Sequence, residues 1–480
     1  MLFNSLTFAI FFTLVCALAA LTNTAPFRGM EREKRMRIRH LLLLAASYVF
    51  YGWWNWKCCA LMLGLTLTAH VCALHMDGKR RRLALGVGVV LPLLILGVFK
   101  YFNFFVDSFC VLFGIARAGT LSILLPVGIS FYTFQSLSYT IDVSRGKIAP
   151  ERDFVRTALY ISFFPQLVAG PIVKAGDFIP QLHEERTITA EGLALGVQYF
   201  AFGLFKKIVL ADNLGVFVDA VHAAPDAYSA GTLLLMAYAY AIQIYCDFSG
   251  YSDMAVGCAR VLGYDLPRNF NLPYLSRNVS EFWKRWHISL GSWLQDYLYI
   301  PLGGNRRGEA RTYLNLFLTM TVGGLWHGAA WTFVAWGALH GAALCVHKLW
   351  TKWRRAHGAG RGGPVLTGLN VLLTFTWVSL CLVVFRADSI GKAFRIIANI
   401  FTLHPGVSFV SFWAVTALVL TALCSLAAVL RSRRNGTRPD GWYPTVDLTR
   451  FGGLTLFFTF VGLTLAVAYT GQSPFIYFQF

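Results

Sequence analysis

Charged residues are scarce in this chain. Asp, Glu, Lys and Arg make up 14% of its 480 residues, whereas soluble domains carry roughly 25%. Hydrophobic residues account for 56%, and no long polar stretch separates the apolar segments. This composition excludes a large soluble catalytic domain, and we predict an integral membrane protein.

The cysteines also lack any pattern. There are ten, without the paired spacing of metal ligands, and most stand in apolar segments, as Cys16, Cys72, Cys246, Cys345 and Cys424 do. A buried thiol there behaves as a small hydrophobe. The sequence therefore predicts neither disulfides nor a metal site, and no bound cofactor.

Apolar segments that could cross a bilayer recur along the chain. A spanning helix needs about 20 mainly apolar residues. Such segments lie at 4 to 24, 40 to 57, 58 to 76, 83 to 105, 120 to 141, 366 to 386, 406 to 430 and 453 to 471. We predict an all-α polytopic membrane protein with about twelve membrane helices.

The net charge of +19 is explained by topology rather than by nucleic-acid binding, because the basic residues cluster at the ends of apolar segments. Arg28 to Arg39 follow the first segment, and Lys79 to Arg82 precede the one near Leu83. Further basic loops lie at Lys352 to Arg361 and Arg431 to Arg434. Since basic loops stay in the cytoplasm, we expect a retained first span and an extracytoplasmic N-terminus.

The middle of the chain is less regular than its ends. We divide one membrane domain into N-terminal helices at 1–119, a core at 120–350 and C-terminal helices at 351–480. In the core, prolines, glycines and polar residues interrupt the apolar segments. Broken helices at membrane depth face protein or a water-filled cavity. The sequence therefore predicts re-entrant and interfacial helices in the core.

Two core stretches carry polar groups with more than one explanation. Leu124 to Gly146, with Gln135 and Asp142, predicts either hydrogen-bonded helix packing or the lining of a substrate tunnel. In "YCDFSGYSDMAVG", Asp247 and Asp253 flank a Ser-Gly pair. These carboxylates could bind substrate or pair with a cation of the site, but capping a broken helix end is the commoner use of Asp beside Ser and Gly.

The stretch "NVSEFWKRWHISL" predicts a short helix at the membrane interface. Asn278 and Glu281 have the spacing of a capping box. Lys284 and Arg285 stand among tryptophans, a mixture typical of the headgroup zone, so His287 is expected near a membrane surface or dipping inward from it. Arg285 is a candidate substrate contact.

A glycine-rich basic loop, "LGGNRRGEAR", follows this helix. Its Asn305 and Arg306 are candidate contacts for the phosphates of a nucleotide-bearing acyl donor. The loop matches no phosphate-loop pattern, and ordinary positive-inside charge explains it equally well.

The stretch "GGLWHGAAW", Gly323 to Trp331, places one histidine among small apolar residues. Small residues let other backbones approach closely. Desolvation there favours a neutral imidazole for His327, which is the form that can take a proton from a hydroxyl. We predict His327 as the catalytic residue and Trp326 as a substrate contact, whereas His340 is expected to make a packing hydrogen bond.

These motifs, in this order, resemble the membrane-bound O-acyltransferase family, in the branch of the bacterial alginate O-acetyltransferase membrane subunit. The resemblance rests on "LLLLAASYVFYGWW", "LLPVGISFYTFQSLSYTIDV", "FFPQLVAGPIV", "YCDFSGYSDMAVG", "EFWKRWHISLGSWLQDYLYIPLGGN", "GGLWHGAAWTF" and "SPFIYFQF". It implies a ring of membrane helices around a central funnel, with His327 catalytic and His287 in a supporting role.

The resemblance also implies an activity. An enzyme of this kind passes acetyl groups from a cytoplasmic thioester, with acetyl-CoA as the expected donor, across the bacterial inner membrane to an extracytoplasmic polysaccharide such as alginate. A hydrolase-like extracytoplasmic partner is expected. Peptidoglycan O-acetylation and D-alanyl transfer to teichoic acid are alternatives with the same mechanism, and a transporter or flippase without acyl chemistry is an alternative of another class.

Overall fold

The computed structural model describes residues 1–24, 27, 29–116, 123–358, 363–437, 445–471 and 475–476. Several predicted features therefore fall outside the described residues. They are Arg28 and Arg361 of the basic loops, the start of the span at 120–141, and most of the terminal motif at 473–480.

Helices make up the described part of the chain, which holds no β-sheet and only one isolated bridge, between Tyr228 and Val407. The all-α prediction is thus confirmed for these residues. Within the described ranges, five helical segments are long and apolar enough to cross a membrane by length and composition, and the predicted count of about twelve is not confirmed. The five are Lys57–Leu74, Arg81–Phe113, Ala190–Ala223, Pro364–Arg386 and Phe412–Arg434.

The chain forms two compact units, each assembled from separate parts of the sequence. The first comprises Met1–Leu204, Tyr251–Pro267 and Thr445–Phe457, and the second comprises Phe205–Gly250, Arg268–Pro444 and Phe458–Phe480. These units cut across the three segments predicted from the sequence. Helices α11 (Ala190–Phe205), α13 (Ala230–Val261) and α21 (Phe451–Ala466) contribute residues to both.

The helices of each unit have the following bounds. The first unit holds α1 (Leu6–Leu21), α3 (Arg32–Asn55), α4 (Lys57–Leu74), α5 (Arg81–Leu96), the π-helical turn η1 (Gly97–Tyr101), α6 (Phe102–Phe113), α7 (Ile129–Ser144), α8 (Phe154–Ser162), α9 (Phe164–Leu167) and α10 (Ala175–Leu182). The second holds the π-helical turn η2 (Lys206–Ala211), α12 (Asp212–Ala223), the short turns η3 (Pro225–Ala227) and η4 (Pro273–Leu275), α14 (Val279–Trp283), α15 (Ile288–Leu294), the π-helical turn η5 (Gln295–Tyr299), α16 (Glu309–His327), α17 (Trp331–Ala356), α18 (Pro364–Arg386), α19 (Ile390–Phe401) and α20 (Phe412–Arg434).

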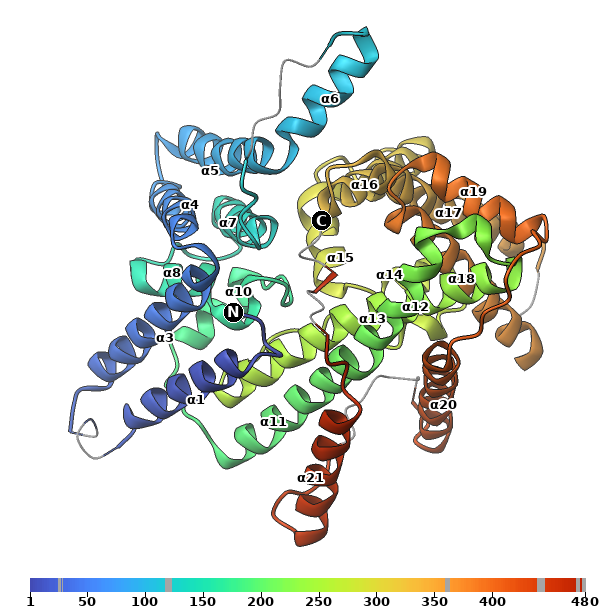
Figure 1. Cartoon of the computed structure of the whole chain (residues 1–480). Helices are drawn as coiled ribbons and strands as arrows, with labels where there is room; N and C mark the ends of the chain where they lie inside the picture. The colour runs from blue at the N-terminus through green and yellow to red at the C-terminus, as the bar shows by residue number, and fades with distance from the viewer. Residues whose placement is uncertain are drawn as a thin grey trace. The chain divides into compact units, whose positions relative to one another are not determined.

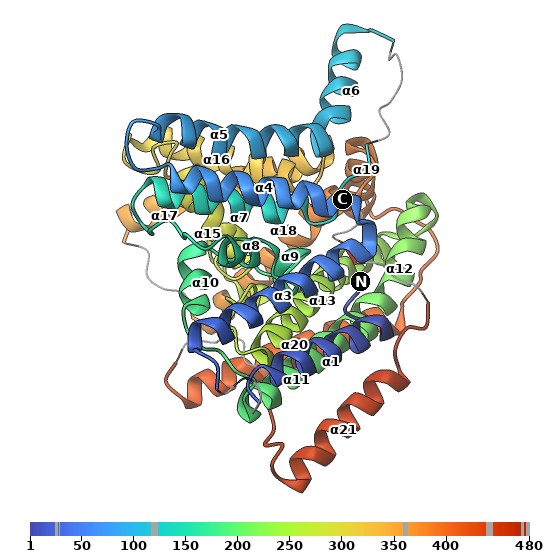
Figure 2. The same ribbon diagram turned by 90° about the vertical axis from the view of Figure 1, so that its left-hand side faces the viewer.

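Helix α7 forms the polar centre of the first unit and packs between α4, α5 and α8 (Figure 2). Every residue of α7 except Ile141 is buried. Its hydroxyls return hydrogen bonds to the helix: Ser138 Oγ donates to the Gln135 carbonyl, which also accepts from Tyr160 Oη. The structure thus supports the helix-packing alternative for this stretch.

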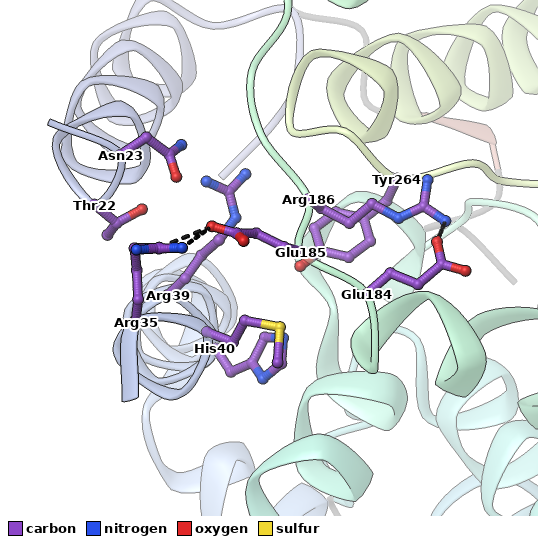
Figure 3. A pocket seen from close by; sticks show the side chains of 10 residues that line it. Thr22, Asn23, Arg35, Arg39, His40, Glu184, Glu185, Arg186 and Tyr264 are labelled. Atoms are coloured by element: carbon purple, nitrogen blue, oxygen red, sulfur yellow. Dashed lines mark hydrogen bonds and ion pairs between the residues drawn. The ribbon is translucent and has the colours of Figure 1, made fainter. Parts of the chain in front are cut away.

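Arg39 joins two helix ends within the first unit. Its guanidinium donates to the Ala19 carbonyl of α1 at 3.1 Å and to the Leu262 carbonyl beyond α13 at 2.8 Å. The last carbonyls of a helix have no partner within it and carry partial negative charge, so a cation stabilises them. Figure 3 shows Arg39 beside the ion pair that Arg35 forms with Glu185. The cavity that this polar cluster lines has a volume of only about 10 Å³, too small for a substrate. The cluster therefore stabilises the packing of these helices.

Helices α16 and α17 pack closely in the second unit, and glycines make the approach possible (Figure 1). A Cβ on Gly324 would lie 2.2 Å from the Phe333 carbonyl oxygen, and one on Gly337 would lie 2.3 Å from the Met320 carbonyl oxygen. No side chain fits at those distances. The predicted close approach of backbones at the small residues is confirmed, and it fixes the C-terminal end of α16, where His327 lies.

Replacing Gly337 by valine is therefore expected to force α16 and α17 apart. Overpacking a core costs typically about 1–3 kcal/mol, and here the obstacle is backbone that cannot rotate away. We expect a clearly lower thermal unfolding midpoint in detergent. Gly368→Val on α18 is the matched control, because a Cβ there meets nothing within 4 Å. Equal midpoints for the two variants would contradict the packing argument.

Candidate functional site

Two histidines predicted from separate motifs lie together in the second unit. The ring centroids of His287 and His327 are 6.3 Å apart. Both side chains are buried, with 0% of His287 and 5% of His327 exposed. The structure thus brings the two predicted residues into one site.

His327 is the last residue of α16 and lies in an aromatic setting. Trp326 precedes it, with ring centroids 5.0 Å apart, and Trp336 from α17 and Phe385 from α18 lie at 5.1 and 5.5 Å. The chain leaves the helix in an extended conformation at Gly328. Three helices therefore place the imidazole in a pocket of rings that excludes bulk water.

His287 connects α14 to α15 with an unusual backbone. Its φ of 43° lies in the left-handed region, where a residue with a Cβ is strained. Its Nδ1 is 3.1 Å from Oδ1 of Asn269, and its ring packs edge-on against Phe248 at 4.7 Å. Packing from α13 and α16 buries the ring completely, and its predicted position near a membrane surface, or dipping inward from it, stays a prediction.

Helix α14 begins as the sequence predicts. The Asn278 side chain caps it by accepting from the Glu281 backbone N–H at 2.8 Å. Arg285 donates to Glu281 Oε1 and to the Asn271 carbonyl. Arg285 therefore braces the turn that leads to His287, and its predicted contact with substrate stays a prediction.

His340 makes the packing hydrogen bond that the sequence predicts. Its Nδ1 accepts from Trp283 Nε1 at 3.3 Å, which ties α17 to α14. Trp336 of α17 contacts both His340 of the same helix and His327 of α16. Its ring centroid is 5.0 Å from that of His340 and 5.1 Å from that of His327. Sequence reasoning missed Trp336, although its spacing of one helical turn from His340 could have indicated a shared face.

A cavity of about 940 Å³ runs along α16 and α17. One end is lined by Glu309, Lys352 and Arg355, and the other by Trp283 and Met320. Trp283 contacts Trp336 at 5.7 Å, and Trp336 in turn contacts His327. The cavity therefore leads from the ends of these helices towards the histidine pair.

An ion pair lies at the charged end of the cavity. Lys352 Nζ donates to both carboxylate oxygens of Glu309, at 2.7 and 2.8 Å. These hydrogen bonds lower the pKa of Glu309 below its ordinary value. Lys284 and Lys348 add further positive charge to the walls, so the cavity suits a ligand that carries anionic groups.

The predicted contacts Asn305 and Arg306 lie elsewhere. Both are exposed in the loop between η5 and α16, and neither lines the cavity. The Arg306 backbone N–H donates to the Gly303 carbonyl. This placement favours the topological explanation of the loop's charge, and phosphate contact stays a prediction.

Asp247 belongs to a buried ion-pair triad. Its Oδ1 is 2.7 Å from Lys207 Nζ, which also lies 2.8 Å from Asp212 Oδ1. Its Oδ2 accepts the Ile476 backbone N–H at 2.9 Å, and the Phe475 ring lies 4.5 Å from the same ammonium. With both oxygens engaged, Asp247 anchors the C-terminal segment, and its predicted contact with substrate stays a prediction.

The helix break predicted at the Ser-Gly pair beside Asp247 is wrong. Helix α13 runs without interruption through Ser249 and Gly250, because a single glycine is tolerated where tertiary packing supports the helix. Asp253, the other predicted carboxylate, is buried on the same helix, in the first unit. Its predicted contact with substrate stays a prediction.

The dilysine pair in "LFKKIVL" was missed by sequence reasoning. Lys206 and Lys207 lie in η2, where the π-helical turn directs both inward: Lys206 Nζ donates to Ser249 Oγ at 3.1 Å. The signal was available, because two lysines stand in the middle of an apolar segment. Ionisable residues in such a place need partners.

Among the described residues, no group of three or more potential metal ligands is found.

Comparison with known proteins gives consistent results. Residues 149–385 match the model of the membrane-bound O-acyltransferase family. The chain is 38% identical over 481 residues to the probable alginate O-acetylase of Pseudomonas putida, covering 95% of this chain and 97% of that protein. It is 37% identical over 398 residues to the peptidoglycan O-acetyltransferase of Helicobacter pylori, covering 77% and 74%. It is 27% identical over 281 residues to the teichoic acid D-alanyltransferase of Bacillus subtilis, covering 56% and 69%.

Proposed function

This chain belongs to the membrane-bound O-acyltransferase family, and we propose that it passes acetyl groups from a cytoplasmic thioester across the inner membrane for O-acetylation of an extracytoplasmic polysaccharide of the alginate type. That the chain is a membrane-bound O-acyltransferase follows from its family and relatives. The proposal of acetyl transfer rests on one observation: two buried histidine rings lie 6.3 Å apart, and Trp336, which contacts His327, also contacts Trp283 in the wall of a cation-lined cavity.

The reaction needs a base in a dry site. His327 takes the proton of the acceptor hydroxyl as its oxygen bonds to the thioester carbonyl carbon. The carbon–sulfur bond then breaks, and the departing thiolate receives that proton from the imidazolium. The products are an ester and a free thiol, and the imidazole returns to its neutral form.

The aromatic surroundings support this role of His327. The rings of Trp326, Trp336 and Phe385 enclose the imidazole. Exclusion of water strengthens electrostatic interactions within a site and protects the thioester from hydrolysis. His287, whose ring lies 6.0 Å from that of Trp326 and 6.3 Å from that of His327, assists by orienting a reactant.

The cavity is proposed as the donor site. Its volume of about 940 Å³ lies within the range of small-molecule sites, about 300–1,000 Å³. Acetyl-CoA carries its charge on the nucleotide and its acetyl group at the far end of a flexible arm. Lysines at the outer end and tryptophan at the inner end match that distribution of charge.

The orientation follows from the basic helix ends. Helix α17 ends near Arg354 and Arg355, and α20 ends with Arg431, Arg433 and Arg434. Basic ends favour the cytoplasm, so the charged end of the cavity opens towards cytoplasmic acetyl-CoA. The same rule supports an extracytoplasmic N-terminus and residence in the bacterial inner membrane.

Reversing a cavity charge is expected to weaken the nucleotide part of donor binding. For Lys348→Glu we expect the KM for acetyl-CoA to rise about three- to tenfold, since each exposed ionic contact contributes modestly. The KM for acetyl-pantetheine, which lacks the nucleotide, should not change. Arg433→Glu on α20 is the matched control. An equal rise for both thioesters would place the nucleotide elsewhere.

Vesicles of known orientation test the direction of transfer. Labelled acetyl-CoA, which cannot cross a bilayer, is supplied to one face only. We expect label on an extracytoplasmic polysaccharide acceptor when the donor is on the cytoplasmic face, and none when it is on the other. Movement of a solute without a donor, and without label on any acceptor, would instead support a transporter or flippase.

The acceptor and the partner are separate parts of the proposal. Relatives act, by name, on alginate, peptidoglycan and teichoic acid, and the identity over nearly the full chain favours alginate-type exopolysaccharide. A hydrolase-like extracytoplasmic protein is proposed to complete the transfer. Acetylation assays with purified alginate and with peptidoglycan distinguish these two acceptors. An assay with a D-alanyl thioester as donor tests D-alanyl transfer to teichoic acid.

A further inference from the structure

We propose that Asn269 is a positioning residue that holds His287 as the tautomer protonated at Nδ1, so that Nε2 is the accepting atom of the ring. This inference rests on the proposed function only where it concerns catalysis, because the tautomer itself can be measured without any turnover. It assigns a role to a residue that lies 18 positions before His287.

The orientation of the Asn269 amide is fixed by Ser289. The Ser289 backbone N–H points to Oδ1 of Asn269 at 3.3 Å, and the Ser289 hydroxyl donates to the same atom at 2.9 Å. A backbone N–H can only donate. The atom that faces it must therefore be the amide oxygen rather than the amide nitrogen.

The tautomer of His287 follows from that orientation. An amide oxygen can only accept, so the Nδ1 atom 3.1 Å away must carry a proton. In a neutral imidazole the other nitrogen, Nε2, then holds the lone pair. Because His287 is 0% and Asn269 2% exposed, bulk water does not compete for these groups.

The backbone reinforces this arrangement. The Ile288 N–H donates to the Asn269 carbonyl at 2.9 Å, so Asn269 binds the backbone directly after His287 as well as the His287 ring. That bond, together with the amide, holds His287 in its left-handed conformation at φ 43°. Strained backbone of this kind persists only where its surroundings determine it.

The neighbours of the ring indicate what Nε2 serves. Phe248 covers one side at 4.7 Å, and Trp326 and His327 lie at 6.0 and 6.3 Å. His327 is the titratable group among these three. An accepting nitrogen beside the proposed base can hold a reactant's hydroxyl or thiol by its proton, which orients that group towards His327.

The direct test is the nitrogen NMR spectrum of the protein with ¹⁵N-labelled histidine, in lipid, because the two tautomers have different nitrogen shifts. We expect His287, assigned by its loss in His287→Gln, to be protonated at Nδ1. Asn269→Asp should retain that tautomer, since a carboxylate also accepts. Asn269→Ala should lose it. An Nε2–H tautomer in the unmodified protein, or an unchanged tautomer in Asn269→Ala, would overturn the proposal.

Kinetics test the consequence for catalysis. Loss of one buried hydrogen bond predicts about a tenfold or greater fall in kcat for Asn269→Ala, with a smaller effect on the donor KM and partial recovery in Asn269→Asp. Asn399→Ala on α19, whose amide donates to Asp226, is the matched control. If Asn269→Ala merely fails to fold, Asn269→Asp still decides: a folded Asp variant that has lost the Nδ1–H tautomer contradicts the proposal. Absence of acetyl transfer in every form, with the tautomer as expected, would contradict the proposed function alone.

Discussion

Replacing His327 by alanine is expected to lower acetyl transfer about 100-fold or more, which is the usual scale for loss of a general base. The ring lies among Trp326, Trp336 and Phe385, and none of these three side chains can act as a base in its place. The measurement is kcat in reconstituted membranes at saturating donor, with protein amounts matched. His75→Ala, an exposed histidine after α4, is the control and should retain full activity.

His287→Ala should fail differently. A residue that orients a reactant affects KM together with kcat, so we expect a smaller loss of kcat than in His327→Ala and a raised KM for the acceptor. If His287→Ala abolishes turnover while His327→Ala leaves it nearly intact, the two roles are reversed.

Replacing Lys207 by methionine is expected to be strongly destabilising. Lys207 is fully buried between Asp247 and Asp212, and removing one partner of a buried ion pair costs about 3–5 kcal/mol because the remaining charges have no compensation. We expect a large fall in the unfolding midpoint in detergent and a reduced amount of protein in the membrane.

Lys207→Met can destabilise the protein because an attraction is lost or because the charge of Asp247 is left buried without a partner. The double variant Lys207→Met with Asp247→Asn separates these two causes. We expect it to be more stable than Lys207→Met alone, since the buried charge at Asp247 is removed as well. The exposed pair of Arg395 with Asp226, 3.2 Å apart, provides a control: Arg395→Met should leave the midpoint unchanged. Equal effects at the two sites would contradict a buried, structural role for Lys207.

The sequence predicted the site better than its surroundings. His287 and His327 stand in motifs whose polar groups are unusual in apolar segments, and the structure brings the two rings together. The sequence left open whether His287 lies near a membrane surface or dips inward from it, because Lys284 and Arg285 suggested an interface. Local composition does not reveal that Phe248, from a distant helix, covers the ring.

Long-range pairs were the least predictable feature. Lys207 and Asp247 are separated by 40 positions, and Asp247 reaches Ile476 across 229. Each charge can be flagged in the sequence as needing a partner, but the choice of partner depends on how helices pack. Asn269 gave no signal of its own, because its role arises only when His287 adopts a left-handed backbone.

The predicted number of about twelve membrane helices is not confirmed by the length and composition of the helices in the described residues. Apolar periodicity located α4, α18 and α20 well. In the core, short helices such as α8, α14 and α15 carry apolar residues without the length to cross a bilayer. Hydropathy alone does not separate such buried segments from spans.

The most direct test of the central claim uses the purified chain alone, in proteoliposomes, with labelled acetyl-CoA and alginate as the hydroxyl acceptor, and without any extracytoplasmic partner. If this chain handles the acyl group itself through His327, it will turn over the thioester or become labelled, and His327→Ala will not. If the unmodified chain neither consumes acetyl-CoA nor acquires label until a partner is added, the chain is a scaffold for chemistry done elsewhere, and the assignment of its histidine pair to acyl transfer is contradicted.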